Sequence, residues 1–176
     1  VEMTLGVMRA MGVEALTADG TRYIVPAFQR YRVGMYAVEP DASAATYFWA
    51  AAAITGGRVR VAGLTCASTQ GDVRFADLLA RMGCSIQEGP DGLAVEGPSR
   101  GQLQGVAVDM NDLPDAVQTL AVVALFADGP TEIRNVANLR LKETDRLAAL
   151  ATELTRLGAR VEARPGGLTI HPPERL

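Results

Sequence analysis

The chain carries one pattern twice, as YFWAAAAITGGRVRV at residues 47–61 and as LAVVALFADGPTEIR at residues 120–134. Each copy begins as an apolar helix, passes a glycine and continues as a short alternating segment. Glycine suits the left-handed backbone with which many helices end. Alternation of polar and apolar residues is typical of a strand. The sequence therefore predicts two copies of one supersecondary unit.

The second half of each copy predicts an amphipathic helix followed by a hairpin. Apolar residues recur at helical spacing from Val73 to Met82 and from Leu147 to Leu157. An acid precedes each helix, Asp72 or Asp145, and we expect it to cap the helix N-terminus. Turns rich in glycine and proline follow at residues 89–92 and 164–167, as in hairpins.

With a strand expected before each copy, at residues 33–39 and 106–109, each unit is predicted to be βαβαββ. The pitch is about 72–75 residues. Because the first helix of each unit is apolar on nearly every face, it is expected in the middle of the fold. We predict an α/β protein with buried helices and outward-facing sheets. Residues 1 to about 30 resemble the tail of a preceding copy, with a hairpin at 14–17 and 23–26.

Composition excludes several classes of protein. The 176 residues are 48% hydrophobic and 21% charged, which is typical of a folded chain. A net charge of −3 argues against non-specific nucleic-acid binding. One histidine and two cysteines, Cys66 and Cys84, are too few for a structural zinc site, and we expect both cysteines in the core. We also expect no membrane span, no signal peptide and a cytoplasmic location. The absence of an initiator Met suggests a piece of a longer protein.

The first candidate for chemistry is the segment DMNDLPDAVQT at residues 109–119, which leads from a strand into the apolar helix. Pro114 fits the first turn of that helix. Asp115 beside it has two interpretations. It can be a capping carboxylate that complements the helix dipole, or a partly desolvated base at the end of a buried helix.

The second candidate is the segment NVANLRLKETDR at residues 135–146, which crowds five ionisable residues into one turn. Thr144 or Asp145 is expected to cap the helix that follows, which leaves Arg146 in its first turn. A cation there opposes the helix dipole and calls for an anion, such as a bound carboxylate or phosphate. Lys142 and Glu143 add a donor for oxygen anions and a proton donor. The alternative is a solvated cluster of salt bridges, which contributes little.

Four segments resemble the 5-enolpyruvylshikimate-3-phosphate (EPSP) synthase family, in the family's order and spacing over essentially the whole chain. They are VEPDASAATYF at 38–48, QGD at 70–72, NDLPD at 111–115 and, above all, RNVANLRLKETDR at 134–146. The resemblance implies transfer of the enolpyruvyl group of phosphoenolpyruvate to the 5-hydroxyl of shikimate-3-phosphate, with release of phosphate, on the route to chorismate.

The resemblance also implies the architecture. Family enzymes have two domains, each of three βαβαββ units of the enolpyruvyl transferase type, with substrates in the cleft between them. Residues 1–37 would be the tail of the last unit of one domain. Residues 38–176 would be two successive units of the other.

The resemblance assigns roles to five residues. Asp115 matches the acceptor of the proton from the 5-hydroxyl, and Glu143 matches the acid that protonates the phosphoenolpyruvate methylene. Asn138 and Lys142 match ligands of shikimate-3-phosphate, and Arg146 matches an anchor of phosphoenolpyruvate. No metal or organic cofactor is implied.

More than half of the family enzyme has no counterpart in these residues, including several of its substrate-binding lysines, arginines and serines. We therefore expect a partial enzyme, inactive alone, whose partners are its substrates and the missing parts of the same enzyme, with no nucleic acid and no membrane. Two alternatives stay open. One is a UDP-N-acetylglucosamine enolpyruvyl transferase, which shares the repeat, and the other is a non-catalytic structural fragment.

Overall fold

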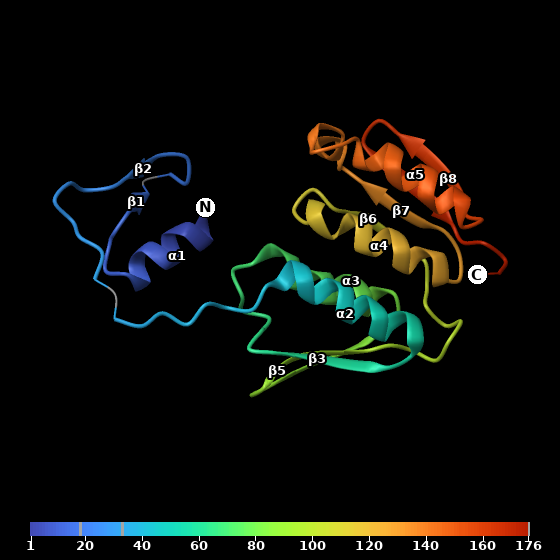
Figure 1. Cartoon of the computed structure of the whole chain (residues 1–176), viewed down its shortest axis with the longest axis horizontal. Helices are drawn as coiled ribbons and strands as arrows, with labels where there is room; N and C mark the ends of the chain where they lie inside the picture. The colour runs from blue at the N-terminus through green and yellow to red at the C-terminus, as the bar shows by residue number, and fades with distance from the viewer. Residues whose placement is uncertain (18, 33, 176) are drawn as a thin grey trace. The chain divides into compact units, whose positions relative to one another are not determined.

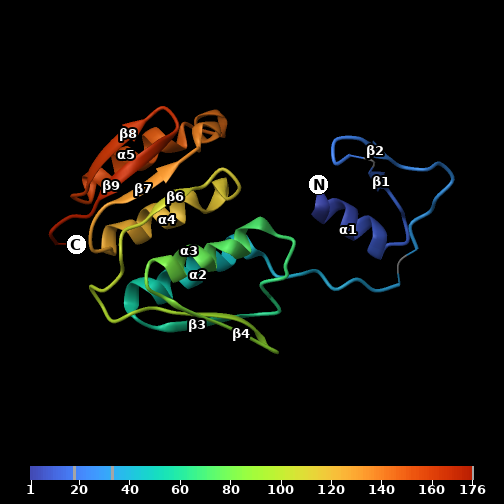
Figure 2. The same cartoon turned by 180° about the vertical axis from the view of Figure 1, so that it is seen from behind.

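The structure is a computed structural model that describes residues 1–17, 19–32 and 34–175. The chain divides into two compact units, Val1–Glu39 and Pro40–Leu176. Figures 1 and 2 show the course of the chain in each. Among the described helices, none is long and apolar enough to cross a membrane.

The smaller unit holds one helix and a hairpin, namely α1 (Glu2–Ala10), β1 (Leu16–Thr17) and β2 (Tyr23–Ile24). The two strands pair antiparallel, so the predicted hairpin is confirmed in a shorter form. The turn is organised by Asp19, whose carboxylate accepts hydrogen bonds from the backbone N–H groups of Thr21 and Arg22, both at 2.9 Å. These donors lower the pKa of Asp19.

The first repeat copy lies in the larger unit. Its elements are α2 (Ala42–Thr55), β3 (Arg58–Ala62), a 3-10 turn η1 (Gly71–Arg74), α3 (Phe75–Arg81), β4 (Ser85–Gly89) and β5 (Gly92–Glu96). The sheet has the order β3-β5-β4 and is antiparallel throughout. As predicted, α2 ends at a glycine in the left-handed region, Gly56, with φ 71° and ψ 18°.

The prediction of a strand before this copy is wrong for the residues that the structure describes. Residues 34–39 form no strand, and Val33 lies outside the described residues. Such a strand would pair with β3, but β3 is hydrogen-bonded only to β5 among the described strands. The predicted cap by Asp72 is wrong as well, because Asp72 lies inside η1 and its carboxylate instead accepts a hydrogen bond from the Ser43 hydroxyl at the start of α2.

The second copy is a complete βαβαββ unit. Its elements are β6 (Ala107–Asp109), η2 (Pro114–Ala116), α4 (Val117–Val123), η3 (Ala124–Phe126), β7 (Thr131–Arg134), η4 (Ala137–Leu141), α5 (Arg146–Arg156), β8 (Arg160–Arg164) and β9 (Gly167–His171). The sheet order is β6-β7-β9-β8, with β6 and β7 parallel and the other pairs antiparallel. Parallel pairing places the carboxyl ends of β6 and β7 at one edge of the sheet.

The core of the larger unit lies between the two sheets. Figures 1 and 2 show α2 and α4 side by side, with β3 and β5 beyond α2 and β7 beyond α4. A buried contact of 3.2 Å between the hydroxyl oxygens of Thr46 and Thr119 links the two helices. Trp49 and Leu120 are fully buried beside it. The predicted architecture of central helices and outward sheets is confirmed.

Burial of the central helices is less complete than predicted. Tyr47 and Phe48 on α2 are 64% and 61% exposed, although the adjacent Trp49 is fully buried. Cys84 is buried, which raises the pKa of its thiol to about 11. Cys66 is exposed, so its predicted core position is wrong. It lies in the loop after β3, where its backbone N–H donates to a carboxylate oxygen of Glu88 at 3.0 Å.

Candidate active site

The two candidate segments meet where α4 and α5 begin. Asp115 lies in η2, the turn that leads into α4, and Arg146 is the first residue of α5. Arg146 Nη1 lies 2.9 Å from Asp115 Oδ1. Lys142 Nζ lies 3.6 Å from the same oxygen. The fold therefore brings together side chains that are far apart along the chain.

The turn that carries Lys142 and Glu143 is held at both ends. Asp145 caps α5 by accepting a hydrogen bond from the backbone N–H of Ala148 at 3.0 Å. Arg140 donates to Asp145 at 2.7 Å. It also donates to the backbone oxygen of Pro165, in the turn between β8 and β9, at 3.0 Å, and to that of Arg164, the last residue of β8, at 2.9 Å. Because Ala148 and Arg140 stabilise its carboxylate, the pKa of Asp145 is lowered.

Arg146 is the centre of the cluster. Its Nε and Nη2 donate to the two carboxylate oxygens of Glu143, at 2.8 and 3.0 Å, so the pair is bidentate. The Arg146 side chain is 19% exposed, against 53% for Asp115 and 65% for Glu143. The hydrogen bond from Arg146 lowers the pKa of Glu143. Glu143, and then Asp115, raise the pKa of Arg146.

Gln118 is a further partner of Arg146 that the sequence analysis missed. It lies on α4, three residues after Asp115, and is half-buried. In the amide orientation that gives both groups a partner, its oxygen accepts from Arg146 Nε at 3.2 Å and from Nη1 at 2.9 Å. The signal was present in the sequence, because residues three apart share a helix face.

Two expectations about these residues need correction. The Asp115 side chain is 53% exposed, and its interpretation as a partly desolvated base stays a prediction, whereas the expected cap needs correction. Asp115 does not cap the helix, since η2 has no side-chain cap hydrogen bond. The anion that Arg146 was expected to require is supplied by the chain itself, through Glu143 and Asp115.

Asn138, the fifth candidate residue, lies in η4 and is not one of the residues that form the ion pairs around Arg146. It lines a cavity of about 470 Å³ together with Asp109, Asn111, Asn135, Ala137 and Gly166. This cavity lies where β6 and β7 end. Asn135, with a φ of 60°, donates a side-chain hydrogen bond to Asp109. The backbone N–H of Asn111, and then Asn135, lower the pKa of Asp109. Polar residues after two parallel strands are the signal that could have identified this edge.

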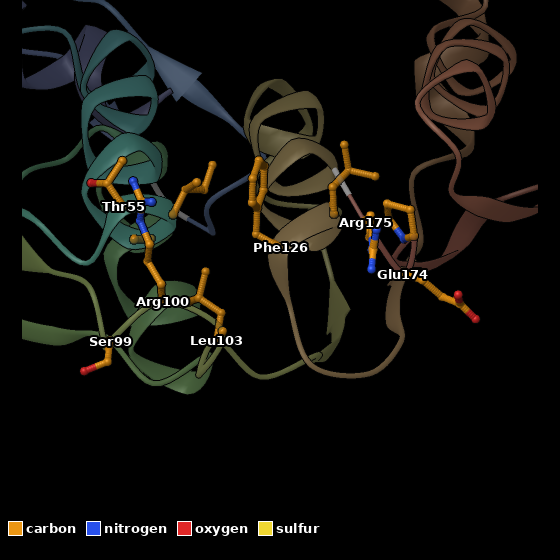
Figure 3. Close-up of a pocket in the computed structure, with 12 residues that line it drawn as sticks. Thr55, Ser99, Arg100, Leu103, Phe126, Glu174 and Arg175 are labelled. Atoms are coloured by element: carbon orange, nitrogen blue, oxygen red, sulfur yellow. The ribbon is translucent and has the colours of Figure 1, made fainter.

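A second cavity, of about 370 Å³, lies away from the cluster. Figure 3 shows it at the other ends of the central helices, lined by Thr55 of α2, by Phe126 of η3 and by Arg100, Leu103 and Arg175. The side chains of Asp115, Lys142, Glu143 and Arg146 do not line it.

Solved structures identify the class of fold. The EPSP synthase of Acinetobacter baumannii superposes with a TM-score of 0.78 at 24% identity, over 96% of this chain and 40% of that one. The enolpyruvyl transferase NikO from Streptomyces tendae superposes with a TM-score of 0.68 at 20% identity, over 98% of this chain and 40% of that one. The chain therefore has the fold of the enolpyruvyl transferases.

Sequence comparison identifies the family within that class. The model of the EPSP synthase (3-phosphoshikimate 1-carboxyvinyltransferase) family matches residues 1–176, and the chain belongs to this family. The resemblance seen in the sequence is thereby confirmed, and it is favoured over the UDP-N-acetylglucosamine alternative.

Named relatives agree. The 3-phosphoshikimate 1-carboxyvinyltransferase of Nostoc punctiforme is 51% identical over 172 residues, which are 98% of this chain and 40% of the relative. The enzyme of the same name from Citrobacter koseri is 49% identical over 177 residues, 100% of this chain and 41% of the relative. The chain thus spans about two fifths of the length of the curated relatives it matches.

Proposed function

We propose that this chain supplies part of the active site of a 3-phosphoshikimate 1-carboxyvinyltransferase. The reaction transfers the enolpyruvyl group of phosphoenolpyruvate to the 5-hydroxyl of shikimate-3-phosphate and releases phosphate. One observation carries the proposal: Asp115, Lys142, Glu143 and Arg146 form a single cluster of alternating charge at the start of two helices. Family membership supports the choice of reaction.

The residue types suit an addition followed by an elimination. Asp115 accepts the proton of the 5-hydroxyl while the hydroxyl oxygen forms a bond to C2 of phosphoenolpyruvate, and Glu143 gives a proton to C3. The Glu143 carboxylate then takes a proton back from the new methyl group while phosphate departs and accepts the proton held by Asp115, which restores the double bond and both carboxylates. Lys142 and Asn138 bind shikimate-3-phosphate, and Arg146 binds the carboxylate of phosphoenolpyruvate.

The pairing of Glu143 with Arg146 indicates how the proton donor is prepared for the reaction. Glu143 is a poor proton donor while Arg146 holds it as a carboxylate, because that pairing lowers its pKa. An anionic substrate that takes Arg146 from Glu143 removes this stabilisation. Binding of phosphoenolpyruvate therefore prepares Glu143 to hold the proton that it delivers.

The proposal includes the rest of the enzyme. Residues 1–37 are the tail of the last unit of one domain, and residues 38–176 are two units of the other, with the substrates bound between the domains. The partners are shikimate-3-phosphate, phosphoenolpyruvate and the remaining parts of the same enzyme. A cytoplasmic location stays a prediction. Because half a cleft cannot enclose its substrates, we expect little or no turnover from residues 1–176 alone.

The test is a chimera in which residues 1–176 replace the matching stretch of the Nostoc punctiforme enzyme. Phosphate release from shikimate-3-phosphate and phosphoenolpyruvate is measured with and without Asp115→Asn. We expect turnover in the chimera and a loss in kcat of at least about 100-fold in the variant.

The matched control is Asp112→Asn, three residues away, where the exposed carboxylate pairs with Arg74 at 3.6 Å and accepts a hydrogen bond from the Asn111 side chain at 3.3 Å. This control should keep kcat within about twofold. A folded chimera that releases no phosphate would overturn the proposed function.

A further inference from the structure

Arg146 has partners of two kinds. Glu143 and Asp115 are carboxylates on exposed side chains, 65% and 53% exposed. Gln118 is a neutral amide that projects from α4 and is half-buried. In the amide orientation that gives both groups a partner, its oxygen lies 2.9 Å from Arg146 Nη1 and 3.2 Å from Nε. Since the carboxylates are more exposed and are the reactive groups of the proposed function, the half-buried amide is the partner suited to a fixed structural role.

The charge of the cluster explains why an amide suits this place. Arg146 and Lys142 carry two positive charges, and Asp115 and Glu143 carry two negative ones. A third carboxylate would make the cluster net negative and repel an anionic ligand. An apolar side chain would leave guanidinium N–H groups without a partner when Glu143 departs. Gln118 accepts from the guanidinium without adding charge.

We propose that Gln118 is the positioning residue that keeps the Arg146 guanidinium directed at Asp115 while the Glu143 carboxylate gives way to a substrate anion. The inference rests on the proposed function only for the identity of that anion, phosphoenolpyruvate. The hydrogen bond from Arg146 to Gln118 stands on geometry alone. Gln118 acts through Arg146 and does not itself touch substrate.

The first test uses residues 1–176 and needs no activity. Hydrogen exchange of the Arg146 Nε–Hε group is followed by ¹⁵N NMR, with the signal assigned by its loss in Arg146→Lys. The comparison is made in a Glu143→Ala background, because Glu143 otherwise holds Nε at 2.8 Å. There Gln118→Leu removes the second acceptor of Nε at similar volume, and exchange should become at least about fivefold faster than in Glu143→Ala alone. In the same background Gln118→Glu restores an acceptor and should keep exchange at the rate of Glu143→Ala alone.

The matched control for this test is Gln104→Leu, at an exposed glutamine whose side chain donates to the Gln102 carbonyl. It should leave the Arg146 signal unchanged. Unfolding curves for each variant establish that it is folded. Equal Hε exchange in folded Glu143→Ala and in the folded double variant Glu143→Ala, Gln118→Leu would overturn the proposal.

The second test separates positioning from stability in the chimera. Gln118→Leu should raise KM for phosphoenolpyruvate about tenfold with a smaller change in kcat. Gln118→Glu should also raise this KM, because its charge competes with the substrate anion, although it keeps Arg146 in place. An unchanged KM in both variants would overturn the positioning role. A chimera inactive even with Gln118 would overturn the proposed function, and the NMR test would still decide on Gln118.

Discussion

Arg146 Nη1 lies 2.9 Å from Asp115 Oδ1 and joins the first residue of α5 to the turn that starts α4. The same guanidinium binds both oxygens of Glu143. The proposed proton acceptor and the proposed proton donor therefore share one cation. This arrangement makes Arg146 the group whose partners must change for chemistry to begin.

Replacing Arg146 should therefore change the titration of Glu143. In Arg146→Gln the bidentate partner is lost, and the pKa of the Glu143 carboxyl should rise toward its ordinary value, because the hydrogen bond from Arg146 is the main cause that lowers it. ¹³C NMR of the carboxyl carbon as a function of pH measures this directly. The control is Arg156→Gln, which breaks an exposed pair of the same spacing with Glu153. A Glu143 titration curve identical in Arg146→Gln and wild type would contradict the assigned pairing.

Asp145 gives a prediction about stability and pH. Its pKa is lowered in the folded chain by the backbone N–H of Ala148 and by Arg140. A lowered pKa contributes stability above the unfolded-state value, near 3.9, and that stability is lost as pH falls through the folded-state pKa. Asp145→Ala should thus unfold at lower urea concentration than wild type at pH 7.

The urea midpoints of wild type and Asp145→Ala should converge as the pH is lowered toward about 2. Asp91→Ala, in the exposed turn between β4 and β5, is the control and should shift the midpoint little at either pH. If the urea midpoint of Asp145→Ala stays below that of wild type by the same amount at every pH, the charge of the Asp145 carboxylate is not the cause of the lost stability.

Most of the fold was predictable because both copies of the repeat show the same hydrophobic spacing and the same glycine and proline residues where elements end. The apolar helices, the glycine that ends α2 and the two hairpins follow from local patterns. What failed depended on partners distant in sequence. The strand expected at 33–39 does not form in residues 34–39. β3, with which it was expected to pair, is hydrogen-bonded only to β5 among the described strands. Asp72 was expected to cap a helix, but Ser43, from another segment, provides a competing donor.

The sequence indicated which residues are candidates for the site, but it did not show which of them pair with one another. The position of Arg146 in a first helical turn indicated that it needs an anion, and the structure supplies Glu143 and Asp115. Spacing alone did not show that Asp115 is half exposed. Nor did it show that Arg140 fixes the site turn through backbone oxygens of the β8–β9 hairpin, because that contact spans two elements.

Arg140 should matter for the shape of the site as well as for stability. Arg140→Met removes its hydrogen bonds to Pro165, Arg164 and Asp145 while keeping most of the apolar stem. We expect a loss of about 1–3 kcal/mol in the free energy of unfolding, measured in urea. Backbone hydrogen exchange should also accelerate in η4 and the turn before α5.

The control for Arg140 is Arg134→Met, at a more exposed arginine whose pair with Glu132 is 4.0 Å long. It should change the free energy of unfolding by less than about 1 kcal/mol. If both variants lose the same stability, or if exchange in the site turn is unchanged in Arg140→Met, the ties made by Arg140 do not hold the turn.

The neighbours Phe48 and Trp49 test how α2 is buried. Trp49 is fully buried and Phe48 is 61% exposed, so similar truncations should have very different costs. Trp49→Ala should lower the free energy of unfolding by about 3–5 kcal/mol, through lost packing and the cavity left behind. Phe48→Ala should cost less than about 1 kcal/mol, because most of its ring already contacts water. Urea unfolding of residues 1–176 measures both, and comparable losses would mean that α2 buries the Phe48 side as well.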